Sequence, residues 1–202
     1  MDFGAGVGNQ GGISSTERVS VGQLAFKAAS YRSKGERLLH LARFLKPRQI
    51  LELGTHLGIS AAYLLKGNPD SHLISIEGDP VLSQLANEHL RELGLKVDLR
   101  VGQFEEELGK ISWDSFHPEL VFLDGNHRYE PTVAYFDHIV PHVPDGGWII
   151  LDDIHWSPGM KQAWDELRQR REVGISIDLW QVGLLQISRK ENTRHYVLWG
   201  LG

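Results

Sequence analysis

The sequence contains no cysteine. Disulfide bonds and thiolate metal sites are therefore excluded, and cysteine usage gives no information about the redox compartment. The chain also lacks any run of about 18 apolar residues, so it predicts no membrane-spanning helix. Its first residues do not show the basic and then apolar segments of a signal peptide. We therefore expect a cytoplasmic protein with no membrane partner.

Positive charge is scarce as well. The chain carries 21 Lys and Arg residues against 26 Asp and Glu residues, a formal net charge of −5. Proteins that bind nucleic acid usually present a basic surface, so this balance argues against a nucleic-acid partner. The 202 residues are 41% hydrophobic and 23% charged, which is enough apolar material for one domain with a full core.

One stretch, residues 49–60, organises the rest of the chain. Ile50, Leu51 and Leu53 suit a short strand that is buried on both faces, as in a parallel sheet. Gly54 and Gly58 then bracket a turn where the backbone must bend and admit a ligand closely. The helical pattern that follows would direct free N–H groups at that ligand. Open α/β sheets bind nucleotide-like cofactors with this strand, turn and helix.

Five strand patterns alternate with helical patterns along the chain, which predicts right-handed crossovers and a mostly parallel sheet. A pair of later strands is close enough to be antiparallel, and a short final strand follows it. We expect a Rossmann-like α/β three-layer sandwich with a mostly parallel seven-stranded sheet and an antiparallel strand near the C-terminus. The expected strands are 49–53, 72–77, 97–101, 119–124, 148–153, 175–180 and 184–188, with 196–199 as the short final one.

Acidic residues close several of these strands: Glu77, Asp124, Asp152 and Asp153. The carboxyl ends of parallel strands meet at the ligand-binding edge of the sheet, so these side chains should face a common site. Glu77 follows the glycine turn by about twenty residues, where an acid accepts the ribose hydroxyls of a nucleoside. The alternative for Glu77 is a charge that stabilises the N-terminus of the next helix.

The three aspartates carry a more specific hypothesis. Carboxylates crowded together repel one another unless a positive charge lies among them. Mg²⁺ or a similar divalent cation would meet that need and would lower the pKa of a bound substrate oxygen. The alternative is that these aspartates cap helices and bond to loops.

The pattern Glu52-x-Gly54-x-x-x-Gly58 resembles motif I of the class I S-adenosylmethionine-dependent methyltransferases. A cationic cofactor without phosphates gains from carboxylates near its sulfonium and amino groups. The resemblance implies that Glu77 binds the ribose and that Gln103 and Phe104 lie beside the adenine, although Phe104 suits a helix core equally well. The full set of implied cofactor residues is Glu52, Gly54, Thr55, Gly58, Ser60, Glu77, Gly78, Gln103, Phe104 and Asp124.

The segment Asp124-Gly125-Asn126-His127-Arg128-Tyr129 and the Asp152-Asp153 pair resemble the metal-dependent O-methyltransferases of the macrolide-sugar, aminocoumarin and catechol types. The resemblance implies that Asp124, Asp152 and Asp153 are metal ligands. Some relatives have an aspartate base where this chain has Asn126, and asparagine cannot take a proton. The catalytic candidates are then His127, His155 and Asp124, or the metal alone suffices. The alternative for each histidine is a hydrogen-bonded structural role.

We therefore expect an S-adenosylmethionine-dependent O-methyltransferase that acts on a small-molecule hydroxyl with the help of a divalent metal. Residues 1–34 would form a flexible segment or lid, and residues 35–202 the methyltransferase domain. Trp156 and Trp164 could line an aromatic or sugar pocket, but for Trp164 we favour a place in the core of a helix. Other hypotheses are an NAD-type oxidoreductase, which the missing G-x-G-x-x-G motif disfavours, and a non-catalytic binding protein, which the acidic strand ends disfavour. The oligomeric state stays open, with a homodimer as one alternative.

Overall fold

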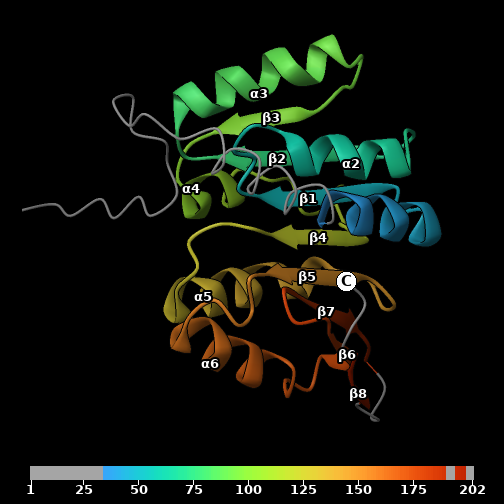
Figure 1. Cartoon of the computed structure of the whole chain (residues 1–202), viewed down its shortest axis with the longest axis vertical. Coiled ribbons are helices and arrows are strands. Elements are labelled where there is room, and N and C mark those ends of the chain that lie inside the picture. The colour runs from blue at the N-terminus through green and yellow to red at the C-terminus, as the bar shows by residue number, and fades with distance from the viewer. Residues whose placement is uncertain (1–33, 190–193, 199–202) are drawn as a thin grey trace, which may run out of the picture.

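The computed structural model describes residues 34–189 and 194–198. The expected lid and an expected helix over residues 21–31 lie outside this part of the chain, apart from Lys34. Within it, eight strands form one sheet in the order β3-β2-β1-β4-β5-β7-β6-β8 (Figure 1). The strands are β1 Gln49–Leu53, β2 His72–Glu77, β3 Asp98–Val101, β4 Leu120–Leu123, β5 Trp148–Asp152, β6 Val173–Asp178, β7 Val182–Ile187 and β8 Arg194–Val197.

The predicted fold class is confirmed. Strands β1 to β5 pair in parallel, and β7 runs antiparallel to both β5 and β6. The expected seven strands are joined by an eighth, β8, which pairs in parallel with β6. The short final strand was expected at 196–199, but it lies two residues earlier, and Trp199 is outside the described residues.

Helices cover both faces of the sheet and give two hydrophobic cores. A helix over residues 34–45 packs on one face together with α2 (Ile59–Gly67) and α3 (Pro80–Glu92). The other face carries α4 (Phe104–Leu108), α5 (Tyr129–Ile139) and α6 (Pro158–Leu167). The 3-10 helix η1 (Val140–His142) follows α5. Because side chains alternate along a strand, Ile50 enters the first core while Leu51 and Leu53 enter the second.

Local signals in the sequence set several helix ends. Asp79 caps α3 by accepting from the N–H groups of Val81 and Leu82 at 2.7 and 3.2 Å, and Ser157 caps α6 through Met160 at 3.1 Å. The pair Ser157-Pro158 predicts a helix that runs to about residue 171, and this predicted end is wrong. The helix ends at Leu167. The N–H groups of Gln169 and Arg170 then donate to carbonyls three residues back, not four as in an α-helix, and the chain turns.

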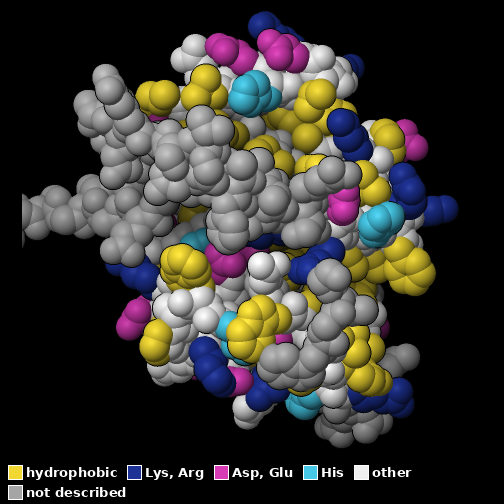
Figure 2. All heavy atoms as spheres, in the orientation of Figure 1, with side chains coloured by type: hydrophobic (Ala, Val, Ile, Leu, Met, Phe, Trp, Pro, Cys, Tyr) yellow, Lys and Arg dark blue, Asp and Glu magenta, His cyan; other side chains and the backbone are white. Residues whose placement is uncertain are grey.

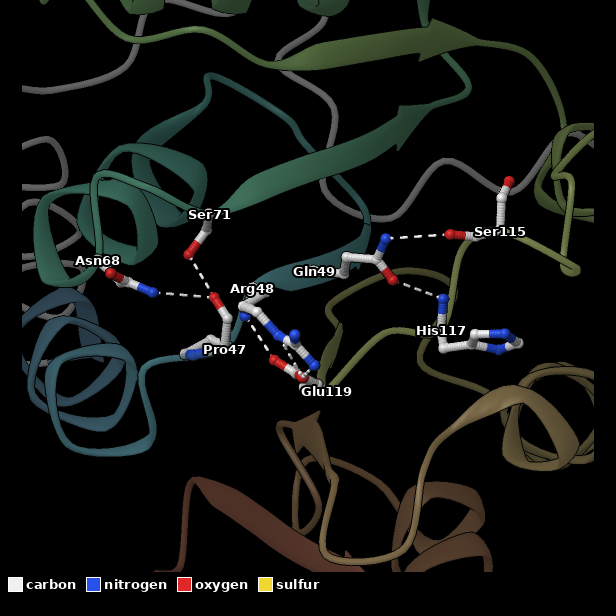
Figure 3. Close-up of polar contacts among 8 residues, drawn as sticks. All are labelled: Pro47, Arg48, Gln49, Asn68, Ser71, Ser115, His117 and Glu119. Atoms are coloured by element: carbon white, nitrogen blue, oxygen red, sulfur yellow. Dashed lines mark hydrogen bonds and ion pairs between the residues drawn. The ribbon is translucent and has the colours of Figure 1, made fainter.

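A hydrogen-bonded network ties the amino edge of the sheet together (Figure 3). The carbonyl of Pro47 accepts from Asn68 Nδ2 at 2.9 Å and from Ser71 Oγ at 2.6 Å. Arg48 contacts Glu119 through its backbone N–H and its guanidinium, which joins the starts of β1 and β4. Gln49 holds the segment before β4 by donating to the carbonyl of Ser115 and accepting from the N–H of His117. The polar groups at this edge therefore satisfy one another.

Basic and acidic side chains are interspersed on the face shown in Figure 2, and histidines lie among them. None of the helices in the described part of the chain has the length and apolar character needed to cross a membrane.

Candidate active site

The predicted glycine turn lies at the carboxyl edge of the sheet between β1 and α2. Gly54 has φ +98° and Gly58 has φ +76°, both in the region that favours glycine. A Cβ atom on Gly54 would lie 2.5 Å from the carbonyl oxygen of Asp124, and one on Gly58 would lie 3.1 Å from Leu90 Cδ1. The glycines therefore allow the backbones after β1 and β4 to touch, which brings the turn and Asp124 together.

Glu52 points into the fold beneath this turn and is fully buried. Its Oε2 accepts from Ser75 Oγ at 2.5 Å, and the Ser75 hydroxyl also contacts Thr55 Oγ1 at 2.5 Å. Glu52 Oε1 has no hydrogen-bond partner among the described residues. Burial raises the pKa of Glu52 from 4.5 to about 7, although the hydroxyl groups of Ser60 and Ser75 oppose the shift. The motif therefore supplies a buried carboxyl group that titrates near neutral pH.

Glu77 ends β2 beside the same turn. Its carboxylate accepts from the backbone N–H of His56 at 2.7 Å and from that of Asp79 at 2.9 Å. The neighbouring Gly78 is exposed, and a Cβ there would lie 3.9 Å from the carbonyl oxygen of Gly102. Glu77 thus holds the glycine turn against the start of α3, and its contact with a ribose stays a prediction.

The loop after β3 brings Gln103 and Phe104 toward the loop after β4. Phe104 lies edge-on to Tyr135 with ring centroids 5.4 Å apart, and its ring packs directly on Gly125. Phe104 is only half-buried, so it combines contact with the second core and partial exposure. Gln103 is exposed and precedes α4 without a side-chain capping bond.

Asp124 and Asp152 come together at the ends of β4 and β5, with His127 beside them. One ligand atom from each of these three residues lies within 4.8 Å of the others. His127 Nε2 is 3.5 Å from Asp124 Oδ1. Asp152 is fully buried, and its Oδ1 has no hydrogen-bond partner among the described residues.

Lys34 supplies a positive charge within this group. Its Nζ forms an ion pair with Asp152 Oδ2 and lies 4.0 Å from Asp124 Oδ2. Burial would lower the pKa of Lys34, but Asp124 and Asp152 outweigh it and raise the pKa above its ordinary value. The ammonium group therefore stays charged.

The pKa values of the two carboxyl groups, Asp152 and Asp124, shift in opposite directions. Burial raises the pKa of Asp152 well above its ordinary value, and the charge of Asp124 adds to the shift while Lys34 opposes it. Burial would also raise the pKa of Asp124, but the hydrogen bond with His127 and the charge of Lys34 outweigh it, and the net shift is downward. Asp124 is therefore the carboxylate of the pair that holds its charge more readily.

Asp153 and Asn126 lie next to this group in strained conformations. Both have positive φ values, 52° and 54°. Asp153 is not a member of the close group around Asp124. Asn126 donates to the Tyr135 hydroxyl at 3.3 Å and accepts from Arg128 Nε at 2.7 Å, so both the nitrogen and the oxygen of its side-chain amide are hydrogen-bonded.

His155 belongs to a different cluster on the turn after β5. Its Nε2 lies 2.9 Å from Asp178 Oδ2, and its ring stacks on Trp180 with centroids 5.0 Å apart. Asp178 also accepts from the N–H of Trp180 at 2.8 Å. Trp180 is largely exposed, as is Trp156 on the same turn as His155. His127 and His155 are therefore distinct sites.

Trp164 lies in the second core, 1% exposed and packed against Gly183, so the helix-core alternative holds for it.

Sequence reasoning missed Lys34, Asp178 and Trp180. Lys34 fell in the segment expected to be flexible, and no short spacing connects it to residues about ninety and 118 positions away. Asp178 ends an antiparallel-paired strand, so the rule for parallel strand ends gave no reason to select it.

The fold and this edge define a class of protein, a Rossmann-like methyltransferase. The sequence profile of a family described as a methyltransferase domain matches residues 51–154, just over half of the chain. The chain belongs to this family, and the predicted class I S-adenosylmethionine-dependent methyltransferase resemblance is confirmed.

A catechol O-methyltransferase of Mycobacterium tuberculosis is 27% identical over 136 residues, which are 66% of this chain and 60% of that protein. The match spans between 45% and 60% of the length of this and other curated relatives of the chain. The O-methyltransferase TomG of Streptomyces achromogenes, solved with S-adenosylmethionine, has a TM-score of 0.68 at 23% identity over 77% of this chain and 80% of TomG. An O-methyltransferase of Bacillus cereus, solved with S-adenosylhomocysteine, has a TM-score of 0.67 at 18% identity over 82% and 88%. The two structures share the fold of this chain.

Proposed function

We propose that the protein is an S-adenosylmethionine-dependent O-methyltransferase for a small-molecule hydroxyl. One observation carries the proposal: Gly54 of the glycine turn lies against the backbone of Asp124, so the cofactor motif and the acidic group share one edge. The family membership supports the cofactor. The catechol O-methyltransferase relative and the two O-methyltransferase structures support oxygen as the methylated atom.

The residues around the turn have the chemistry that this cofactor needs. Glu77 presents a carboxylate to ribose hydroxyls, and Asp124 brings negative charge near the cationic sulfonium. Phe104 offers a half-buried ring for the adenine, next to Gln103. We propose that the remaining predicted residues contribute through the turn itself or by supporting it; these are Glu52, Thr55, Ser60 and Gly78 with the two glycines.

A divalent cation such as Mg²⁺ is the finer part of the proposal. Asp124 and Asp152 offer carboxylate oxygens within 4.8 Å of each other, and the buried Asp152 Oδ1 has no other partner among the described residues. Hard cations prefer such oxygen ligands, so the donor set fits. Asp153, the third predicted ligand, would bind the cation from the turn that follows β5. When bound, the cation would lower the pKa of an acceptor hydroxyl and orient its oxygen.

His127 is the better candidate for the base. It lies within the acidic group and contacts Asp124, whereas His155 is held by Asp178 and Trp180 in its own cluster. A base must be within hydrogen-bond reach of the proton that it removes. We propose that His127 receives the proton of the acceptor and that the exposed Trp156 and Trp180 beside His155 contact the body of the acceptor.

Binding and turnover test this proposal separately. Calorimetry with S-adenosylhomocysteine should show a one-to-one complex, while NAD should give no signal. Transfer of a labelled methyl group from S-adenosylmethionine should then be measured on a panel of phenols, catechols and sugar hydroxyls. Binding of NAD in place of S-adenosylhomocysteine would support the oxidoreductase alternative. Cofactor binding without transfer to any hydroxyl would support the non-catalytic alternative.

A further inference from the structure

The acidic group at the ends of β4 and β5 already contains a cation of the chain itself. Lys34 Nζ pairs with Asp152 Oδ2 and lies 4.0 Å from Asp124 Oδ2, and these are the two carboxylates proposed to bind a divalent ion. An ammonium group and a metal ion cannot occupy the same space between two carboxylates. The two cations must therefore exclude each other wherever they share these oxygens.

Packing fixes the helix that carries Lys34. Gly35 is buried against the ring of Tyr63 in α2, and a Cβ atom at this position would overlap that ring. Gly67 at the end of α2 makes an equally close approach to the backbone of Leu39. Such close backbone contacts leave the helix little freedom to slide.

A second contact ties the same helix to the other side of the site. Arg37 Nη1 donates to Gln181 Oε1 at 3.3 Å, in the turn between β6 and β7. The helix that carries Lys34 is thus held between α2 and the hairpin of β6 and β7, which flanks β5. The long side chain of Lys34 can swing away without moving the helix, because lysine has a flexible four-carbon stem.

The charges of the group also indicate that Lys34 is its cation. Asp152 is fully buried and Asp124 lies directly beside it, so the pair needs a counter-ion. The Lys34 ammonium, which is paired with Asp152 and lies 4.0 Å from Asp124, is the counter-ion that the described residues supply. Asp152 Oδ1, which has no hydrogen-bond partner among the described residues, belongs to the carboxylate that Lys34 holds, so a cation bound there would lie beside the ammonium and be repelled by it.

We propose that Lys34 is the resident cation of the Asp124–Asp152 group and that a divalent ion binds there only by displacing its ammonium. Lys34 then lowers the affinity of the site for metal and keeps the carboxylates paired until a metal arrives. The inference rests on the proposed function for its catalytic meaning, but the exchange itself is a property of these three side chains. Lys34 acts as a positioning residue for the two carboxylates.

Calorimetric titration with Mn²⁺ tests the exchange without any assay of activity. Lys34→Met should bind Mn²⁺ at least ten-fold more tightly than the wild type, and Lys34→Arg, which keeps the charge, should remain close to the wild type. Lys66→Met is the matched control, because Lys66 lies exposed in the last turn of α2, and it should leave the affinity unchanged. Adding Asp152→Asn to Lys34→Met should remove the gain.

Equal Mn²⁺ affinity in the wild type and Lys34→Met, or no binding by Lys34→Met, would overturn the proposal. Circular dichroism of each variant shows whether it is folded, and Lys34→Gln replaces Lys34→Met if the latter is not. S-adenosylhomocysteine is titrated into the wild type in parallel. Its failure to bind would reject the methyltransferase proposal while leaving the Mn²⁺ result to decide the role of Lys34.

Discussion

Substitution of Gly54 by alanine separates the two reasons for which the turn needs glycine. A non-glycine residue in the left-handed region costs roughly 1–2 kcal/mol. A Cβ atom at Gly54 would also lie 2.5 Å from the Asp124 carbonyl oxygen, and relief of such overpacking costs roughly 1–3 kcal/mol. We therefore expect Gly54→Ala to lower the free energy of unfolding by roughly 2–5 kcal/mol.

Gly146→Ala is the matched control. Gly146 has φ +86°, close to the +98° of Gly54, but a Cβ there would meet nothing within 4 Å. The free energy of unfolding of Gly146→Ala should fall only by the cost of a non-glycine residue in the left-handed region, roughly 1–2 kcal/mol. The entropy that alanine removes from the unfolded chain is common to both variants and cancels in their comparison.

Urea denaturation measures both losses, provided that the dependence on urea concentration is unchanged. Calorimetry with S-adenosylhomocysteine adds a second readout, because relief of the clash must move the backbone of Asp124. We expect weaker binding by Gly54→Ala and unaltered binding by Gly146→Ala. Equal losses of stability in the two variants would show that the close approach of β1 and β4 is not what the glycine serves.

Four further variants address single carboxyl and imidazole groups. Glu77→Gln should weaken S-adenosylhomocysteine binding by roughly 10- to 150-fold, the loss of a charged hydrogen bond worth about 1.5–3 kcal/mol; an unchanged dissociation constant would refute the ribose role. The pKa of Glu52 is 4.5 when unperturbed and about 7 when folded, so the folded state binds the proton more tightly and stability should fall as pH rises from 4.5 through 7. Glu52→Gln should flatten that fall, worth roughly 3 kcal/mol, and parallel urea-denaturation profiles from pH 4 to 8 for the two proteins would contradict the reasoning. His127→Ala should reduce kcat by about 10²- to 10⁴-fold with little change in cofactor affinity, whereas His155→Ala should act mainly on KM for the acceptor; the reverse pattern in steady-state kinetics would exchange their roles.

The sequence predicted the central sheet well because its signals are local. Apolar runs such as those in β1, β4 and β5 are buried on both faces, and that burial excludes most alternatives. Polar residues alternate with apolar ones in β3, a pattern typical of a strand half open to water, and β3 lies at one edge of the sheet. Strand ends were less certain by one or two residues, since hydrogen bonding to neighbours decides where pairing stops.

The site was predictable only where topology places residues together. The rule that parallel strands end at one edge correctly predicts that the carboxyl groups of Asp124 and Asp152 lie close to each other. It does not say which way the side chain of Asp153 turns, because that depends on a left-handed backbone at φ 52°. Lys34 has no local signal at all, since its ion pairs join residues that only the packing of its helix brings close.

The two edges of the sheet differ in a way that bears on function. At the amino edge, Arg48, Gln49 and Glu119 satisfy one another and the neighbouring backbone. At the carboxyl edge, buried oxygens of Glu52 and Asp152 have no partner among the described residues. Unpaired buried carboxyl oxygens cost stability, and a protein tolerates such a cost mainly where a ligand relieves it. Both oxygens can accept a hydrogen bond or bind a cation, which fits the cationic methyl donor proposed for this edge. Arg168 Nε and Arg170 Nε, between α6 and β6, are also buried without a partner among the described residues, but as donors they would not suit that ligand.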